Sequence, residues 1–304
     1  MSSSRLPLSL ALLLPLSVLG CDVGQQSSTA TEPTGTGGTT SSSTLPGGAG
    51  GTGGSTGAGA STGTTAGTGG SADPCEGRLL CADFEDGAPR GRSPTPWKTA
   101  TNNGAVVVDD SRAHSGSRSI KVSTGAGQYK QAYFFVQGAP VFPVAGNVIY
   151  GRMMISMDQA ANDGVHWTMI QGSGPVPGKD GVTAHYRYGG QWQQKMMANY
   201  DTQGAKSDCW DHSATKMPVG AWACMEWRFD GPSNDLRFWL DGQEITDMHV
   251  AGAGEGCIGH DLGDVWLAPQ FEKMSLGWES YQQDDAREAW IDDVILDDEP
   301  IGCP

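Results

Sequence analysis

Residues 74–304 break into short segments in which apolar and polar side chains alternate, and turn signals separate these segments. Alternation with a period of two is typical of β-strands that bury one face. The turn signals include Asn103-Gly104, Gly189-Gly190 and Asp241-Gly242, and the last joins the runs LRFWL and QEI as in a hairpin. No long window has a helical period. The pattern predicts an all-β domain of two packed sheets, a sandwich or jelly roll.

The segments with the clearest alternation or apolar character are the expected strands of this domain. They are Leu80–Phe84, Ala105–Asp109, Ser119–Ser123, Tyr129–Val136, Val148–Met157, Val165–Gln171, Val182–Tyr188, Lys195–Tyr200, Trp222–Asp230, Asp235–Leu240, Asp264–Phe271 and Glu288–Leu296.

The first 20 residues predict export. One basic residue, Arg5, precedes the apolar run LALLLPLSVLG, which is too short to span a membrane and is typical of a signal peptide. The junction VLGC, ending at Cys21, resembles a bacterial lipobox, which implies cleavage before Cys21 and lipidation of that residue. Ordinary cleavage with Cys21 as a spare thiol is the alternative. We expect a protein anchored by lipid to the cell envelope, facing the periplasm or the cell surface.

Residues 21–73 predict a flexible tether behind that anchor. Most of this segment consists of Gly, Ser, Thr and Ala, with almost no charged and no aromatic residue. Such a composition buries too little apolar surface to offset chain entropy, so we expect disorder. Residues 74–304 then form a single folded domain.

The charge of the chain narrows the class of partner. The formal net charge is −15 and the isoelectric point is about 4.6, which argues against nucleic acid because that partner needs a basic surface. We expect a monomer that meets the membrane only through its lipid.

The cysteines indicate disulfides. Besides Cys21 the chain has Cys75, Cys81, Cys209, Cys224, Cys257 and Cys303. Six cysteines in an exported domain allow 15 pairings. Proximity along the chain favours Cys75–Cys81 and Cys209–Cys224, which leaves Cys257–Cys303. A zinc site is the competing interpretation, although no pair has C-x-x-C spacing.

The stretch Ala184–Asp201, AHYRYGGQWQQKMMANYD, carries polar and aromatic side chains on two expected strands. Alternation puts His185 and Arg187 on one face of the first strand, with Tyr186 and Tyr188 on the other. A strand that only closes a core does not need His and Arg on one face, whereas a strand lining a wet groove does. The stretch predicts the floor of a groove.

The same phase argument gives a wider set of groove residues. The predicted floor contains His166, His185, Arg187, Asn199, Gln270 and Glu272, with Lys195 in the phase of Asn199 and Trp266 as a stacking platform. The segment Leu276–Gln282 (LGWESYQ) is the predicted rim, with Trp278, Glu279 and Tyr281, and Trp192 joins it from a loop. Indoles pack against sugar rings while polar side chains bind their hydroxyls, so we expect a carbohydrate-binding cleft.

Four motifs in succession resemble a known superfamily. They are CADFEDG (residues 81–87), AHSGSRSIKVS (113–123), WRFDGPSNDLRFWLDGQEI (227–245) and WIDDVIL (290–296). This order resembles the concanavalin A-like jelly rolls, which include lectins, glucanases and polysaccharide lyases. Within that group the chain is most similar to lyase-like secreted domains of the fungal cellulose-induced protein type. The resemblance implies a two-sheet jelly roll with a concave groove.

The same resemblance implies a structural calcium that ties the first strand to the last. The matching positions are Glu85, the Gly116–Ser117 region and Asp292. Calcium prefers several oxygen ligands, which these segments can supply. The alternative is that Glu85, Asp292 and Asp293 are solvated charges at an edge.

The candidate residues favour one reaction over others. A glycosidase needs two carboxylates flanking the bond, and the E-x-D-x-x-E motif of jelly-roll glucanases is absent. A β-eliminating lyase needs cationic or amide groups for the uronate carboxylate, a base and an acid. The predicted catalytic residues are His166, His185, Arg187, Tyr188, Asn199 and Gln270, with Tyr200 or Tyr281 as other possible bases. The signatures of the best-known alginate lyases are absent.

Sequence reasoning therefore predicts a polysaccharide lyase acting on glycans that contain uronic acid. Two alternatives remain open at this point: a non-catalytic carbohydrate-binding or adhesion lipoprotein, and a glycoside hydrolase.

Overall fold

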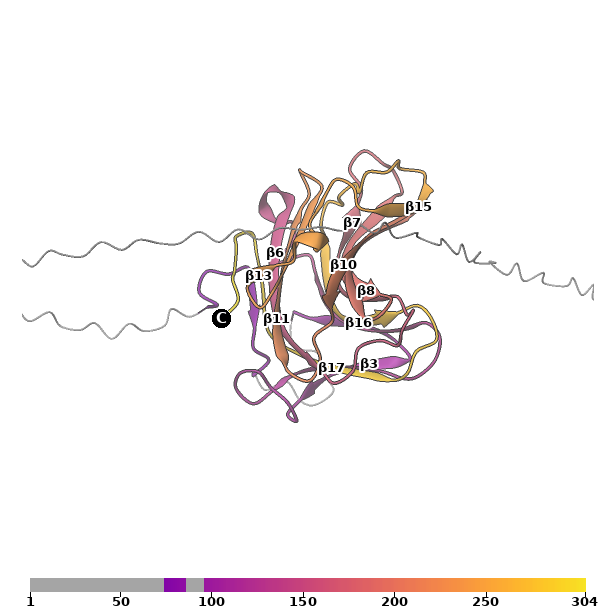
Figure 1. The fold of residues 1–304 in the computed structure, drawn as a ribbon. Coiled ribbons are helices and arrows are strands. Elements are labelled where there is room, and N and C mark those ends of the chain that lie inside the picture. The colour runs from indigo at the N-terminus through magenta and orange to yellow at the C-terminus, as the bar shows by residue number, and fades with distance from the viewer. Residues whose placement is uncertain (1–73, 86–95) are drawn as a thin grey trace, which may run out of the picture. The chain divides into compact units, whose positions relative to one another are not determined.

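The computed structural model describes residues 74–85 and 96–304, which form two antiparallel sheets packed face to face. Figure 1 shows the two layers, with β6, β11 and β13 in one and β7, β8 and β10 in the other. The signal peptide, the tether and Cys21 lie outside the described residues. The prediction of an all-β sandwich of the jelly-roll type is confirmed.

The nine-stranded sheet contains, in spatial order, β13 (Gln243–Glu244), β12 (Asp235–Leu240), β11 (Trp222–Asp230), β6 (Val148–Met157), β17 (Arg287–Asp297), β4 (Ser119–Thr124) and β3 (Gly104–Asp109), with β1 (Leu80–Ala82) paired to β17 and β14 (Val250–Ala251) to β12.

The eight-stranded sheet contains β15 (Gly256–His260), β10 (Ser207–Lys216), β9 (Lys195–Gln203), β8 (Thr183–Gln191), β7 (Trp167–Pro175), β16 (Lys273–Ser280), β5 (Lys130–Gln137) and β2 (Lys98–Asn102).

Aromatic side chains fill the space between the sheets. Tyr188 of β8 stacks on Phe229 of β11 with ring centroids 5.6 Å apart, and Tyr186 meets the same ring edge-on at 5.8 Å. All three are fully buried. Burying one large apolar side chain contributes about 1.5–3 kcal/mol, so these contacts hold the two layers together and fix which face of each strand points outward.

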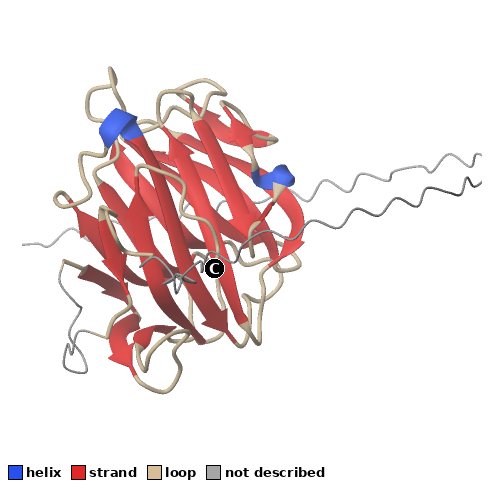
Figure 2. Ribbon diagram, turned by 90° about the vertical axis from the view of Figure 1, so that its left-hand side faces the viewer, coloured by secondary structure: helices blue, strands red, loops and turns tan. Residues whose placement is uncertain are grey.

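Helical structure is limited to two short 3₁₀ turns in the described residues, at Ala145–Asn147 and Thr246–Met248, and Figure 2 shows them in connections between strands. No helix in residues 74–85 and 96–304 has the length and apolar character needed to cross a membrane.

The three disulfides differ in part from the predicted set. Cys75–Cys81 is as predicted, but the other two bonds are Cys209–Cys257 and Cys224–Cys303. Chain proximity was the wrong guide because Cys209 and Cys224 lie on β10 and β11, which belong to different sheets. The sheet register instead places Cys209 directly opposite Cys257.

One strand prediction and the rim prediction were also wrong. Asp264–Phe271 contains no strand, and it forms an irregular connection instead. The next segment, which sequence analysis assigned to a rim, is β16, and it lies between β5 and β7 inside the eight-stranded sheet. The tertiary pairing therefore puts Lys273–Ser280 in the floor of the sheet.

Candidate functional site

An open cleft of about 480 Å³ lies on the outer face of the eight-stranded sheet. Its side chains come from five neighbouring strands, β5, β16, β7, β8 and β9, and from the residues just before β5 and β16. The polar groups that line it include Tyr129, Gln131, Gln171, Ser173, His185, Arg187, Glu272, Lys273 and Glu279. A concave site with convergent polar groups is the first place to look for ligand binding.

Strand β8 carries the centre of the cleft because its side chains alternate. His185 and Arg187 line the cleft, whereas Tyr186 and Tyr188 belong to the core between the sheets. The predicted division of this strand into two faces is confirmed. Tyr188 cannot be a catalytic residue in this arrangement, since its hydroxyl bonds the carbonyl of Met248 inside the molecule.

The Gly189-Gly190 pair, predicted as a turn, lies inside β8. A Cβ on Gly190 would come within 2.3 Å of the Trp167 indole. Glycine is therefore required here because the indole of β7 lies against the backbone of β8, and the chain turns only after Gln191.

The strand register arranges the cleft side chains in rows. One row contains Ser173, His185 and Asp201, and the next contains Gln171, Arg187 and Asn199. Directly paired residues on adjacent strands have Cβ atoms about 4.5–5.5 Å apart. Each row therefore places side chains of β7, β8 and β9 within contact of one another.

Arg187 is a fixed cation at the floor of the cleft. Its Nε donates to Gln171 Oε1 over 2.7 Å, and its Nη1 lies 2.9 Å from Asp201 Oδ2. Only 8% of the residue is exposed. Burial alone would lower its pKa, but the nearby Tyr281, Asp201 and Glu279 outweigh burial and raise the pKa of Arg187. The guanidinium therefore keeps its charge.

His185 is neutral at ordinary pH. Its Nδ1 lies 2.8 Å from Ser173 Oγ, and its Nε2 has no hydrogen-bond partner among the described residues. Burial, together with the charges of Arg187 and Lys273, lowers the pKa of His185 to about 3. When Nδ1 carries the proton, Nε2 presents a free lone pair.

Glu279 of β16 accepts hydrogen bonds from several tyrosine hydroxyls near Arg187. Its carboxylate accepts hydrogen bonds from Tyr129 (2.7 Å), Tyr281 (2.7 Å), Tyr133 (3.2 Å) and Gln131 Nε2 (3.2 Å). Burial and the bond to Glu279 raise the pKa of Tyr129, and burial raises that of Tyr133 and Tyr281. These hydroxyls therefore stay protonated and are held in place by one acceptor.

Lys273 adds a second cation to the cleft. It begins β16, and its Nζ lies 4.1 Å from the centre of the Phe135 ring. Burial lowers the pKa of Lys273. Sequence reasoning did not find Lys273, Ser173 or Tyr129, because the strand β16 and the order of its neighbours were not known.

Sequence reasoning also missed Gln171, because β7 has a bulge. The register between β7 and β8 shifts between Thr168 and Ile170, and both Met169 and Ile170 are fully buried in the core. An extra residue in one strand reverses the alternation beyond it. Gln171 therefore faces the cleft, and no local signal in the sequence marks the bulge.

Two tryptophans predicted to bind sugars belong to the core instead. Trp278 stacks on Trp167 with ring centroids 5.1 Å apart, and Trp266 stacks on Tyr200 at 6.0 Å. Trp278 is 1% exposed and Trp266 is 0% exposed. Both predictions were wrong because the indoles point between the sheets. Tyr200 lies on the same inner face, so it cannot act as a base in the cleft.

Gln270 does not lie in the cleft either. It belongs to the irregular segment after Asp264, and its Nε2 donates to Asn147 Oδ1 over 3.1 Å. It lines a different surface hollow with Asn147 and Pro177. The predicted catalytic role of Gln270 depended on a strand that is not formed.

Four other predicted residues are not among those that line the cleft: His166, Asn199, Lys195 and Trp192. His166 lies against the Tyr281 ring at 4.7 Å, and burial lowers its pKa to about 4. Asn199 donates to Asp208 and to the carbonyl of Cys209, which ties β9 to β10. Lys195 begins β9, opposite Gln191.

Trp192 follows β8 and is 55% exposed, stacked on His212. Glu272 lines the cleft as predicted.

The residues predicted to hold calcium meet at one turn. Glu85 accepts hydrogen bonds from Ser117 and from the amide of Arg118, while Asp292 accepts the amides of His114 and Ser115. Burial raises the pKa of Asp292 to about 6, and the charge of Asp293 adds to this effect.

This donor set of carboxylates and hydroxyls fits the chemistry of calcium. Glu85 and Asp292, with Asp293, would hold the ion and would gain a counter-charge. A bound ion would have to share oxygens that now accept amide protons. The calcium site stays a prediction.

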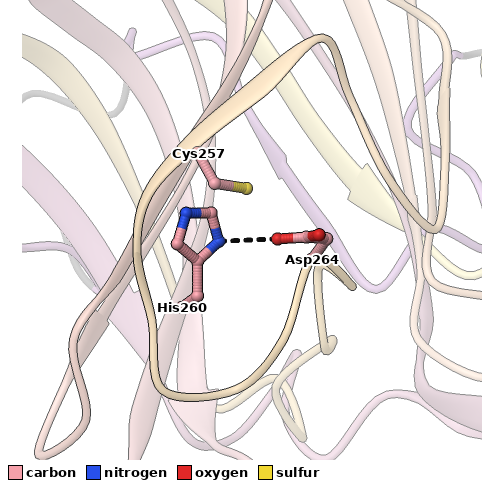
Figure 3. Close-up of side chains that lie close together, drawn as sticks. All are labelled: Cys257, His260 and Asp264. Carbon is pink, nitrogen blue, oxygen red and sulfur yellow. Dashed lines mark hydrogen bonds and ion pairs between the residues drawn. The ribbon is translucent and has the colours of Figure 1, made fainter.

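A second group of ligand-type side chains lies at the edge of the sheet. Figure 3 shows Cys257, His260 and Asp264 close together, with His260 Nδ1 2.6 Å from Asp264 Oδ1. The sulfur of Cys257 is bonded to Cys209, which leaves only two exposed ligands. This group therefore does not make the zinc site that was the alternative to disulfides.

Two solved structures are similar to the chain. A structure described as cellulose induced protein, Cip1, matches at 25% identity with a TM-score of 0.56, covering 74% of this chain and 100% of its own. An endo-β-1,4-glucuronan lyase from the fungus Trichoderma reesei matches at 10% identity with a TM-score of 0.48, covering 73% of this chain and 96% of its own. The second likeness is too low to inform function.

No curated protein matches the sequence. Residues 83–299, more than half of the chain, match the family model described as Polysacc_lyase-like: Cip1-like, core domain. Together with the cleft and its polar floor, this match identifies a carbohydrate-active protein that belongs to the polysaccharide-lyase-like family with a Cip1-like core domain.

Proposed function

We propose that this protein is a polysaccharide lyase that cleaves glycans containing uronic acid by β-elimination. The observation that carries the proposal is a neutral histidine beside a permanent cation. His185, with its unpartnered Nε2, and Arg187 lie two residues apart on the same face of β8. Two residues of a strand span about 6.6 Å, which suits a base and a carboxylate-binding group acting on one sugar ring.

Arg187 receives the carboxylate of the uronate in this mechanism. Gln171 and Asp201 hold the guanidinium, so its position is fixed before the substrate arrives. Lys273 adds positive charge from β16, which lies two strands from β8 in the same sheet. Negative charge spreads onto the carboxylate when the C5 proton leaves, and a preorganised cation lowers the energy of that state.

His185 acts as the base. Its Nε2 is buried in the structure, so the imidazole must turn toward the sugar before Nε2 takes the C5 proton. The electrons of the broken C5–H bond then form the C4–C5 double bond. The low pKa of His185 makes it a weak base, but a bound carboxylate favours the imidazolium and so raises that pKa. Binding of the substrate therefore makes His185 a stronger base.

Tyr129 acts as the acid. The C4–O4 bond breaks as the double bond forms, and the hydroxyl of Tyr129 gives its proton to O4. The raised pKa of Tyr129 keeps this proton in place until then. The proton is donated to Glu279 in the structure, and it must turn from that carboxylate to O4 as the C4–O4 bond breaks. The products are one chain end with an unsaturated uronate and one with a free hydroxyl.

Hydrolysis by the carboxylate pair in the cleft is disfavoured by distance. Glu272 and Glu279 both line the cleft, but they are seven residues apart on one extended segment. That spacing corresponds to roughly 23 Å, whereas glycosidase carboxylates lie about 5–9.5 Å apart.

A binding protein without catalysis is the second candidate. The observation that favours it is that Arg187 already has Asp201 as a counter-ion, 2.9 Å away. The guanidinium can donate to sugar hydroxyls and the carboxylate can accept from them, so this ion pair can bind a sugar without a uronate.

We also propose that the protein works outside the cytoplasm, on a lipid anchor at Cys21. The three disulfides of the described domain support export, because such bonds persist in oxidising compartments. Labelled fatty acid should enter the full chain, and Cys21→Ala should abolish incorporation. Label in the variant would contradict the anchor.

The test of catalysis uses the purified full-length protein with polyglucuronate, polygalacturonate, alginate and glucuronoxylan. A rise in ultraviolet absorbance from unsaturated uronate is expected, and His185→Gln should abolish it. The matched control is His260→Gln, which changes an exposed histidine outside the cleft. Saturable binding without absorbance would identify a binding protein. If the protein neither produces unsaturated uronate nor binds any of these glycans, the assignment of the cleft is overturned.

A further inference from the structure

Trp192 occupies an unusual turn between β8 and β9. Trp192, Gln193 and Gln194 have φ values of 33°, 54° and 63°, so three successive non-glycine residues are left-handed. Such conformations are costly and persist where the surroundings hold them. Here the amide of Lys195 bonds the carbonyl of Trp192, and the amide of Met217 bonds that of Gln194. The turn presents an indole at the surface.

Stacking against a neighbouring side chain fixes the orientation of the indole. Its ring stacks on His212 with centroids 4.9 Å apart and an angle of 19° between the planes. Glu255 fixes the histidine, because its carboxylate lies 2.8 Å from Nδ1 and also accepts the backbone amide of His212. Trp192 nevertheless remains 55% exposed. An ordered, exposed indole in a domain whose other large aromatics are mostly buried needs an explanation.

The indole lies on the same outer face as the cleft. His212 pairs with Met197, and Met197 pairs with Gly189, which is two residues beyond Arg187 on β8. Residues two apart on a strand share a face. His212 is two strands away from β8, or about 10 Å. The stacked pair of Trp192 and His212 therefore lies beyond the cleft and not inside it.

Polar and aromatic groups connect the two places. Asn199 pairs with Arg187, and the half-exposed Trp210 pairs with Asn199, so β9 and β10 continue the row of Arg187 toward the edge of the sheet. Lys195 follows Trp192 by three residues at the start of β9. A glycan chain that leaves the cleft across these strands meets the indole only after it has crossed two strand spacings, or about 10 Å.

We propose that Trp192, supported by His212 and Glu255, is a distal subsite that stacks a pyranose ring of the same glycan whose uronate lies at Arg187. The inference rests on the proposed binding of a glycan in the cleft, but not on its cleavage. A flat sugar face against an indole gains contact area and excludes water, and it requires little ordering because the indole is already fixed.

The position of the subsite makes affinity depend on chain length. A disaccharide bound at Arg187 does not reach Trp192, whereas a longer oligosaccharide occupies both places. Trp192→Ala should therefore weaken the binding of long chains about tenfold and leave short chains within about twofold. Trp192→Phe keeps an aromatic face and should restore most of the affinity.

The experiment uses the full-length protein and size-fractionated oligosaccharides of polyglucuronate, polygalacturonate, alginate and glucuronoxylan. Binding is measured by calorimetry and by tryptophan fluorescence, which needs no cleavage. The matched control is Trp239→Ala, because Trp239 is a half-exposed indole on β12 of the other sheet. It should bind every oligosaccharide as the unmodified protein does.

The outcomes separate this inference from the proposed reaction. Length-dependent loss in Trp192→Ala without any unsaturated product supports the subsite and overturns the lyase. Unsaturated product with equal affinity of Trp192→Ala and the unmodified protein for long chains overturns the subsite and keeps the lyase. Equal loss for short and long chains, or the same loss in Trp239→Ala, overturns the subsite, as does no binding to any of the four sets.

Discussion

The outer faces of the two sheets carry similar residues but use them differently. On the nine-stranded sheet, Arg228 and Arg237 both pair with Asp235, and the Arg237 side chain is 35% exposed. On the eight-stranded sheet, Arg187 has one carboxylate partner, Asp201, and its side chain is 10% exposed at the floor of a cleft. Arg228 and Arg237 are thus paired with several carboxylates, whereas Arg187 lies in a cleft and is the group that we propose binds the uronate carboxylate.

Two glutamates show the same contrast. Glu226 on the nine-stranded sheet accepts the backbone amides of Ile301 and Gly302, so it fastens the C-terminal segment. Glu279 on the eight-stranded sheet accepts four side-chain donors, three of them phenols. The first arrangement fixes backbone, and the second orients groups that can act on a ligand. The comparison teaches that residue type alone does not distinguish a functional face.

The largest expected effect is on Arg187. Arg187→Ala should lower kcat/KM on the cleaved glycan about 10²–10³-fold, because the developing carboxylate charge loses its fixed cation. Arg237→Ala on the other sheet should change kcat/KM less than about twofold. Initial rates from ultraviolet absorbance measure both, and circular dichroism checks folding. Equal losses in the two variants would remove the distinction between the faces.

Glu279→Gln should have the next largest effect. The amide keeps the size of the side chain but accepts fewer and weaker bonds from the phenols, so kcat should fall about 10²-fold, within the usual range for losing an oriented acid. Glu226→Gln should instead lower the free energy of unfolding by about 1–3 kcal/mol with kcat unchanged. Rates and urea denaturation separate the two. A fall in kcat for Glu226→Gln would contradict the comparison.

The pH dependence of stability sharpens the contrast for His185. The pKa of His185 is about 3 in the folded chain, against an ordinary histidine value of about 6.5. Between these values the unfolded chain binds a proton that the folded chain does not, so stability falls as pH falls from about 6.5 toward 3.

His185→Gln should reduce the slope of the free energy of unfolding against pH by about 1.4 kcal/mol per pH unit. His260→Gln should change this slope much less. Urea denaturation at several pH values between 4 and 7 measures the slope. An unchanged slope in His185→Gln would show that the histidine is not held neutral.

Calcium should have the smallest effect, and it should act away from the cleft. If the ion binds at Glu85 and Asp292, millimolar calcium should raise Tm by about 2–4 °C, which corresponds to roughly 1 kcal/mol for a domain of this size. A chelator should reverse the rise, and Asp292→Asn should abolish it. Thermal unfolding monitors the effect. The same rise in Asp292→Asn would place the ion elsewhere.

Sequence patterns located some cleft residues and missed others, for reasons that particular residues show. His185 and Arg187 were found because alternation within one regular strand is a local property. Gln171 was missed because a bulge at Met169–Ile170 reversed the phase. Trp278 and Glu279 were placed on a rim because the polar and aromatic run around them does not reveal that Lys273–Ser280 pairs on both edges.

The sequence by itself determined the all-β class, the presence of a polar face on β8, the family motifs and the Cys75–Cys81 disulfide, all of which depend on neighbours along the chain. Only the tertiary structure decided that β16 lies between β5 and β7, that Glu279 gathers the phenols beside Arg187, and that Cys209 bonds Cys257. The physical reason is that strand order and register are set by packing between residues far apart in sequence, and a single bulge or crossing changes them without a local mark.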